Sequence, residues 1–183
     1  MLNKEMTKVE IEKELRNQGD YVQIDNITRF LRQNPALDIK KFLYAILIGI
    51  YDRRKMFGEA ADTCGKLAEL MLNSDEKSTC FKKQTEFYIK AGFFEKADAT
   101  FRRTLSETKP NDRPKLNLEI RQFYKNQAEN YEKEKRRSLA VKTYEKILML
   151  DISDYEKKEI QEKLSKLYKE LGMVGEYMKL QKR

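Results

Sequence analysis

Tyrosines and small residues recur along the chain with a long period. Successive tyrosines of one series are 37, 43 and 37 residues apart, at Tyr51, Tyr88, Tyr131 and Tyr168. An alanine stands nine residues after each of the first three, at Ala60, Ala97 and Ala140, and the fourth unit has Tyr177 there. A period of this length is typical of repeat proteins, in which each repeat is one small supersecondary unit.

The residue pattern within each repeat predicts two amphipathic helices joined by a tight turn. Apolar or small residues follow the alanine four and seven positions later, a helical spacing, at Cys64, Phe101 and Tyr144 and then at Leu67, Thr104 and Ile147. Seven positions before the tyrosine stand Tyr44, Phe81 and Tyr124. Four positions after it, Gly92 and Gly172 predict the left-handed residue that ends a helix, and Lys55 and Lys135 replace this glycine in the other two units.

The pattern predicts five helix pairs in a single domain, residues 1–183. The three repeat units cover 38–73, 75–109 and 114–151, between a diverged pair at 4–34 and a capping pair at 154–183. In the first pair the second helix is predicted to bury Ile24, Ile27, Phe30 and Leu31. Capping boxes are predicted at Asp20 with Gln23 and at Ser153 with Glu156, while Pro110 and Pro114 interrupt the longest connection.

One stretch carries a family resemblance. Phe87-Tyr-Ile-Lys-Ala-Gly-Phe-Phe-Glu-Lys-Ala-Asp-Ala-Thr-Phe-Arg has aromatic, glycine, aromatic, small alanine and aromatic residues in the order of the tetratricopeptide signature, which it resembles closely. The resemblance covers roughly residues 40–177. It implies an all-α fold, a right-handed superhelix of about five antiparallel helix pairs, whose first helices line a concave groove for a partner. The family is broad in function, so the resemblance bears on the fold more than on the partner.

Composition agrees with an all-α class. Only 3 prolines and 7 glycines occur among 183 residues, and 37% of residues are charged. The two cysteines form no CxxC pair, the first residues lack the layout of a signal peptide, and the longest apolar run, Phe42 to Tyr51, is too short for a bilayer. We therefore expect a cytoplasmic protein that does not enter the membrane.

The sequence lacks the residues and motifs that commonly carry out catalysis. The chain has no histidine, which removes the commonest general base and imidazole metal ligands, and it has no glycine-rich phosphate loop. Its carboxylates alternate with lysines along helices, as solvated pairs do. We expect a non-enzymatic protein without a cofactor or metal.

A charged stripe is the candidate binding surface. In columns set by the repeat tyrosine, two neighbouring units share the same Lys-Glu-Lys order, Lys82, Glu86 and Lys90 in one and Lys125, Glu129 and Lys133 in the next. Arg53 and Lys166 occupy the same columns in the flanking units, while Ala45 and Gly49 leave room for an apolar anchor. The resemblance places these columns on the concave face. The eight residues predicted to contact a partner, here called the stripe, are Arg53, Lys82, Glu86, Lys90, Lys125, Glu129, Lys133 and Lys166.

These features favour an adaptor that binds a protein or peptide segment with acidic residues. The net charge of +8 leaves a nucleic-acid-binding repeat as an alternative, but no aromatic column is interleaved with the basic one for base stacking. A structural subunit of a larger complex is the third hypothesis.

Overall fold

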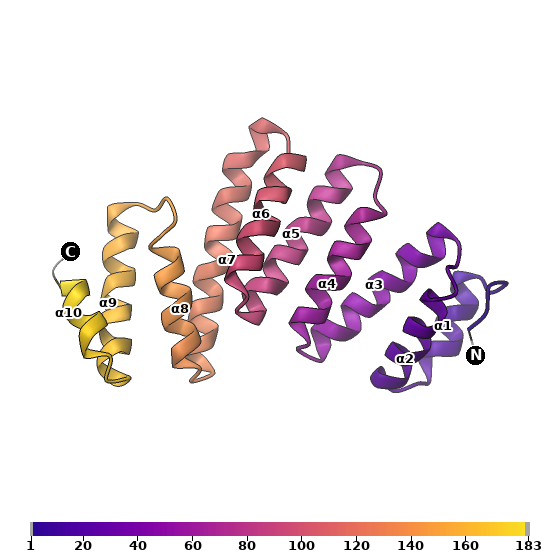
Figure 1. The fold of residues 1–183 in the computed structure, drawn as a ribbon, viewed down its shortest axis with the longest axis horizontal. Helices are drawn as coiled ribbons and strands as arrows, with labels where there is room; N and C mark the ends of the chain where they lie inside the picture. Colours follow the sequence, from indigo (N-terminus) through magenta and orange to yellow (C-terminus); the bar gives the residue numbers. More distant parts are fainter. Residues whose placement is uncertain (1, 182–183) are drawn as a thin grey trace. The chain divides into compact units, whose positions relative to one another are not determined.

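The computed structural model describes residues 2–181, and over that range it is helical with no β-strand (Figure 1). The helices are α1 (Lys8–Arg16), α2 (Asp20–Leu31), α3 (Leu37–Arg53), α4 (Phe57–Glu69), α5 (Ser74–Ala91), α6 (Phe94–Glu107), α7 (Arg113–Lys133), α8 (Arg137–Ile147), α9 (Asp154–Glu170) and α10 (Val174–Gln181), with a short 3-10 helix η1 (Pro110–Asp112). The predicted all-α class is confirmed.

The chain divides into two compact units. Unit 1 is Met1–Lys109 and holds α1 to α6, and unit 2 is Pro110–Arg183 and holds η1 and α7 to α10. Within unit 1, α2 packs on α3, α3 on α4, α4 on α5 and α5 on α6; within unit 2, α7 packs on α8, α8 on α9 and α9 on α10. The extensive packing in each unit is therefore between helices adjacent in sequence.

The turns inside four helix pairs share one backbone geometry. The residue four positions after the repeat tyrosine has a positive φ, which is 57° at Lys55, 77° at Gly92, 58° at Lys135 and 68° at Gly172. The next backbone N–H, from Met56, Phe93, Arg136 or Met173, donates to the carbonyl oxygen of that tyrosine at 2.8, 2.9, 2.8 and 2.8 Å. This is the long hydrogen bond of a Schellman motif. The predicted turn position is confirmed in all four.

The alanines that follow the repeat tyrosines are buried. Ala60, Ala97 and Ala140 have no exposed surface. A larger side chain at these positions would displace neighbouring atoms, since protein interiors are close-packed.

Of the two predicted capping boxes, one is confirmed and the other is wrong. Ser153 caps α9 and forms the predicted box with Glu156. The predicted Asp20 cap is wrong, because Gly19 is the N-cap of α2 and Asp20 is already the first helical residue. Gln23 instead donates its side-chain amide to the Leu15 and Gln18 carbonyl oxygens, at 3.1 and 2.8 Å, so its hydrogen bonds join α2 to the end of α1.

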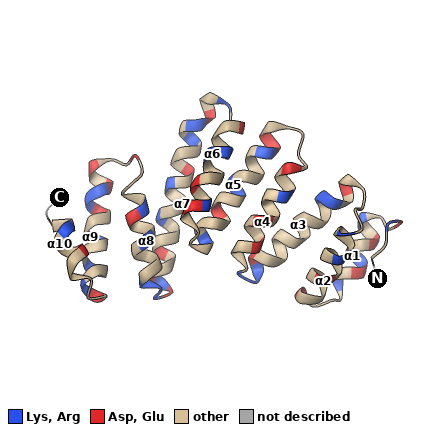
Figure 2. Ribbon diagram, in the orientation of Figure 1, with Lys and Arg blue, Asp and Glu red and all other residues tan. Residues whose placement is uncertain are grey.

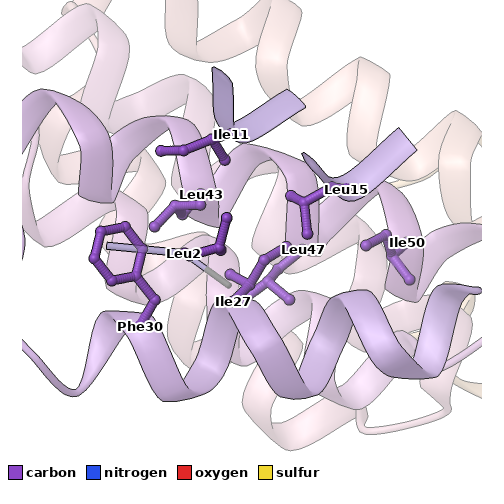
Figure 3. Close-up of a cluster of buried hydrophobic side chains, with 8 residues drawn as sticks. All are labelled: Leu2, Ile11, Leu15, Ile27, Phe30, Leu43, Leu47 and Ile50. Carbon is purple, nitrogen blue, oxygen red and sulfur yellow. The ribbon is translucent and has the colours of Figure 1, made fainter. Parts of the chain in front are cut away.

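An apolar core joins the first three helices (Figure 3). Its buried members are Leu2, Ile11, Leu15, Ile27, Phe30, Leu43, Leu47 and Ile50. Of the α2 residues predicted to be buried, Ile27 and Phe30 are, whereas Ile24 and Leu31 are partly buried against the same core. No helix within residues 2–181 has both the length and the apolar character needed to cross a membrane.

Candidate partner-binding surface

Four stripe residues lie in unit 1, on the first helices of their pairs. Arg53 is the last residue of α3, and Lys82, Glu86 and Lys90 follow one side of α5 four residues apart. Arg53 is exposed, and the three α5 residues are half-buried. The Arg53 guanidinium donates to the Asp20 carboxylate at 3.1 Å, so this residue already links α3 to the start of α2.

Lys90 is held by its neighbours in unit 1. Its ammonium group donates to the Asp52 carboxylate of α3 at 3.1 Å. It also lies over the rings of Phe57 and Phe87, 5.3 and 5.0 Å from their centroids, where the faces of the rings attract a cation. With a side chain only 28% exposed, Lys90 joins helices α3, α4 and α5.

The other four stripe residues lie in unit 2. Lys125, Glu129 and Lys133 are on α7, and Lys166 is on α9. Lys125 donates to the carboxylate of Glu156 in the first turn of α9, and the Arg121 guanidinium lies 3.8 Å from the same carboxylate. The Lys125 hydrogen bond first, and then the backbone N–H of Ser153, lower the pKa of Glu156 to about 2. Lys125 therefore links α7 to the first turn of α9.

Glu129 makes the second contact between these two helices. Lys163 of α9 donates to the Glu129 carboxylate at 2.9 Å and lies 3.6 Å from Glu159. Burial disfavours the charged form of Lys163, but the hydrogen bond and charge of Glu129 outweigh it and raise the pKa of Lys163. Glu129 thus serves as an acceptor for α9.

Acidic and basic residues alternate on the helices of both units (Figure 2). Arg53, Lys90 and Lys125 each face a carboxylate from another helix of the same unit. Lys133 and Lys166 are exposed, and neither makes an ion pair with another residue of the range 2–181. These two lysines of unit 2 are consequently the stripe cations most accessible to an acidic partner.

The structure brings the stripe together within each unit. Lys82, Glu86 and Lys90 share one side of α5, and Lys125, Glu129 and Lys133 share one side of α7. Because α5 belongs to unit 1 and α7 to unit 2, a continuous stripe across all eight residues stays a prediction.

Sequence reasoning missed a role of the repeat tyrosines. The Tyr88 hydroxyl donates to the Asp62 carboxylate of α4 at 2.7 Å, and the Tyr168 hydroxyl donates to the Glu145 carboxylate of α8 at 2.6 Å. Each bond ties the first helix of a pair to the second helix of the preceding pair. The acceptors lie 26 and 23 residues earlier, so no fixed spacing identifies them in the sequence.

Comparisons with protein-family models, with curated proteins and with solved structures found no match to this chain. Within residues 2–181, no three cysteine, aspartate or glutamate side chains converge in a way that could hold a metal ion.

Proposed function

We propose that this protein is a helical-repeat adaptor of the tetratricopeptide kind, and that it binds an acidic segment of a partner protein along the first helices of its repeats. The helix pairs would continue one another as a right-handed superhelix. The protein would work in the cytoplasm and would catalyse no reaction.

The recurring turn geometry is the observation that carries the proposal. Four turns place a left-handed residue and a Schellman hydrogen bond at the same distance from the repeat tyrosine. Equal turns give equal hairpins, so residues in the same column occupy equivalent positions on the first helix of each pair. Recurring surfaces of this kind suit an extended peptide, which meets similar side chains at regular intervals.

The ion pairs indicate how such a surface would recruit its partner. A partner carboxylate can approach exposed Lys133 and Lys166 directly, whereas at Lys90 and Lys125 it would compete with Asp52 and Glu156. Exposed ion pairs are worth about 0 to 1 kcal/mol, so the accessible lysines act mainly through attraction and association rate.

The test is affinity capture from native cells, followed by binding measurements with the identified partner and two double variants. Lys133→Glu with Lys166→Glu changes the first helices α7 and α9, and should weaken binding about tenfold or more. Lys142→Glu with Lys179→Glu makes the same charge change on the second helices α8 and α10, where both side chains are exposed, and should leave binding within about twofold.

Two outcomes would contradict the proposal. One is a loss of binding in the second variant with normal binding in the first, which would place the contacts on the second helices and favour a structural subunit. The other is tight RNA binding at physiological salt, because weak electrostatic attraction alone is lost steeply as salt rises.

A further inference from the structure

A hollow of about 370 Å³ opens in unit 1 among α2, α3 and α4. Its polar lining consists of Arg32 and Thr28 from the end of α2, Tyr44 and Tyr51 from α3, and Thr63 and Lys66 from α4. Buried Leu47 also lines it. This volume is in the range of small-molecule sites, which are commonly about 300 to 1,000 Å³.

The hollow is lined by two cations, Arg32 and Lys66, and both residues are exposed. Some basic residues of unit 1 face carboxylates of neighbouring helices, as Arg53 does with Asp20 and Arg103 with Glu69. Arg32 and Lys66 make no ion pair with any residue of the described range 2–181. The hollow therefore presents two cations that the protein itself does not neutralise.

Hydroxyl groups add neutral hydrogen-bonding capacity beside these cations. The Tyr44 hydroxyl has no hydrogen bond to any residue that the structure describes, whereas the hydroxyl of Thr63 donates to the Glu59 carbonyl oxygen at 2.7 Å. The Tyr51 hydroxyl interacts with Thr28, and the negative charge of Glu59 acts on it as well. The lining thus combines two cations and hydroxyl groups, with one carboxylate nearby.

A corresponding hollow in unit 2 has the opposite character. It also measures about 370 Å³ and opens beside a repeat tyrosine, Tyr168, but Glu145, Glu176 and Lys179 supply its charges. The Tyr168 hydroxyl is already bonded to Glu145. A positive lining is therefore a property of the unit 1 hollow and not a general result of the repeat.

We propose that the unit 1 hollow binds a phosphate monoester, with the phosphoryl group between Arg32 and Lys66 and the organic group against Tyr44 and Leu47. A phosphate monoester carries about two negative charges near pH 7, which matches two unneutralised cations. Its oxygens are strong acceptors for guanidinium, ammonium and hydroxyl donors. The ester would be a phosphorylated side chain of a protein or a free small molecule, which share this chemistry.

This site is separate from the stripe. On α3 the hollow is lined by Tyr44, Leu47 and Tyr51, whereas the stripe columns contain Ala45, Gly49 and Arg53. At 100° per residue, the mean directions of these two sets differ by roughly 170° around the helix axis. The two proposals consequently concern opposite sides of α3, and either can fail without the other.

The experiment titrates phenyl phosphate into the full chain and follows binding by calorimetry and by ³¹P NMR. Saturable binding is expected. Arg32→Gln with Lys66→Gln should weaken it about tenfold or more, since charge-assisted hydrogen bonds are lost. The matched control, Arg16→Gln with Lys83→Gln, removes the same charge from exposed positions outside the hollow and should change affinity by less than about twofold.

Two further binding measurements test the site and identify the kind of phosphate ester. Glu59→Gln removes the nearby negative charge and should tighten binding about two- to fivefold, and weaker binding would contradict the site. A phosphotyrosine peptide that binds at least about tenfold more tightly than phenyl phosphate identifies a protein-borne ester, whereas equal affinity identifies a free one; both support the site.

The proposal is overturned if phenyl phosphate shows no saturable binding, or if the two double variants lose affinity equally, which would indicate non-specific attraction. The stripe variant with Lys133→Glu and Lys166→Glu should bind phenyl phosphate as the wild type does. Failure of the adaptor proposal therefore leaves this result unchanged.

Discussion

Lys55 and Lys135 adopt a backbone conformation that suits glycine. Their φ values of 57° and 58° lie in the left-handed region, where a Cβ atom costs roughly 1 to 2 kcal/mol. Gly92 and Gly172 meet the same requirement without that cost. The two lysines therefore keep the turn at some expense in stability.

Replacing Lys135 by glycine is expected to stabilise the protein by about 1 kcal/mol, because the strain disappears while glycine loses somewhat more backbone entropy on folding. Urea denaturation measures the difference. The reverse change, Gly92→Ala, should destabilise by a similar amount. Equal midpoints for wild type and both variants would show that the turns do not have this geometry in solution.

Tyr88 makes stability depend on alkaline pH. Burial first, and then the hydrogen bond to Asp62, raise the pKa of Tyr88 from 10.0 to about 12. Since the folded-state pKa is the higher one, the contribution of Tyr88 is complete below pH 10 and is lost as pH rises toward 12. The shift corresponds to roughly 2 to 3 kcal/mol.

Unfolding measured from pH 9 to 12 should therefore show a shallower decline in stability for Tyr88→Phe than for the wild type. At neutral pH the variant should lose only about 1 kcal/mol, the typical net value of one hydrogen bond. Identical slopes in the two proteins would contradict a raised pKa of Tyr88.

At the scale of elements, Glu156 is one of two carboxylates that link α7 and α9, and Glu129 is the other. Glu156 accepts from Lys125, lies near Arg121 and completes the capping box of Ser153. Its pKa is lowered from 4.5 to about 2, so its contribution is present above pH 4.5 and is lost as pH falls through this interval. The side chain is 24% exposed, so screening reduces the effect to about 2 kcal/mol.

Glu156→Gln should accordingly reduce stability at pH 7 and flatten its decline between pH 4.5 and 2. Thermal unfolding at several pH values tests both effects. Glu162→Gln, on an exposed position of the same helix, serves as the control and should retain the acid decline of the wild type.

The sequence predicted those features of the elements that are local. Helical periodicity and the left-handed turn residue depend on neighbours within a few positions, so the four turns were placed correctly from the repeat tyrosines. The predicted N-cap of α2 is wrong because Gly19 and Asp20 are both acceptable N-caps, and residue type alone does not choose between them.

Contacts between pairs were not predictable in the same way. The stripe is predicted to contact a partner, yet Lys90 and Lys125 are held by Asp52 and Glu156. The partners lie 38 and 31 residues away and depend on how the helices pack. Because these separations differ, a single sequence has no fixed spacing that would identify the two ion pairs.

At the scale of the whole molecule, each unit has buried residues of its own. Unit 1 contains the core around Ile27 and Leu43, and unit 2 buries Tyr131, Tyr144 and Leu164. A segment that buries its own core can fold alone. Residues 1–109 produced separately should therefore give a helical circular dichroism spectrum and a cooperative thermal transition.

The full chain should also be almost purely helical by circular dichroism. Appreciable β-sheet would contradict the fold, and a fragment 1–109 without cooperative melting would show that unit 1 needs the rest of the chain.

Packing between sequence neighbours has a consequence for synthesis. In unit 1, α3 meets α4, and α5 meets α4 and α6, so no helix waits for a distant segment before it can pack. Ribosomes add about 5 to 20 residues per second, whereas helices form in about a microsecond. Each hairpin therefore has seconds to fold onto the previous one as it emerges, and the nascent chain exposes little more than one unpaired apolar helix face to chaperones at any moment.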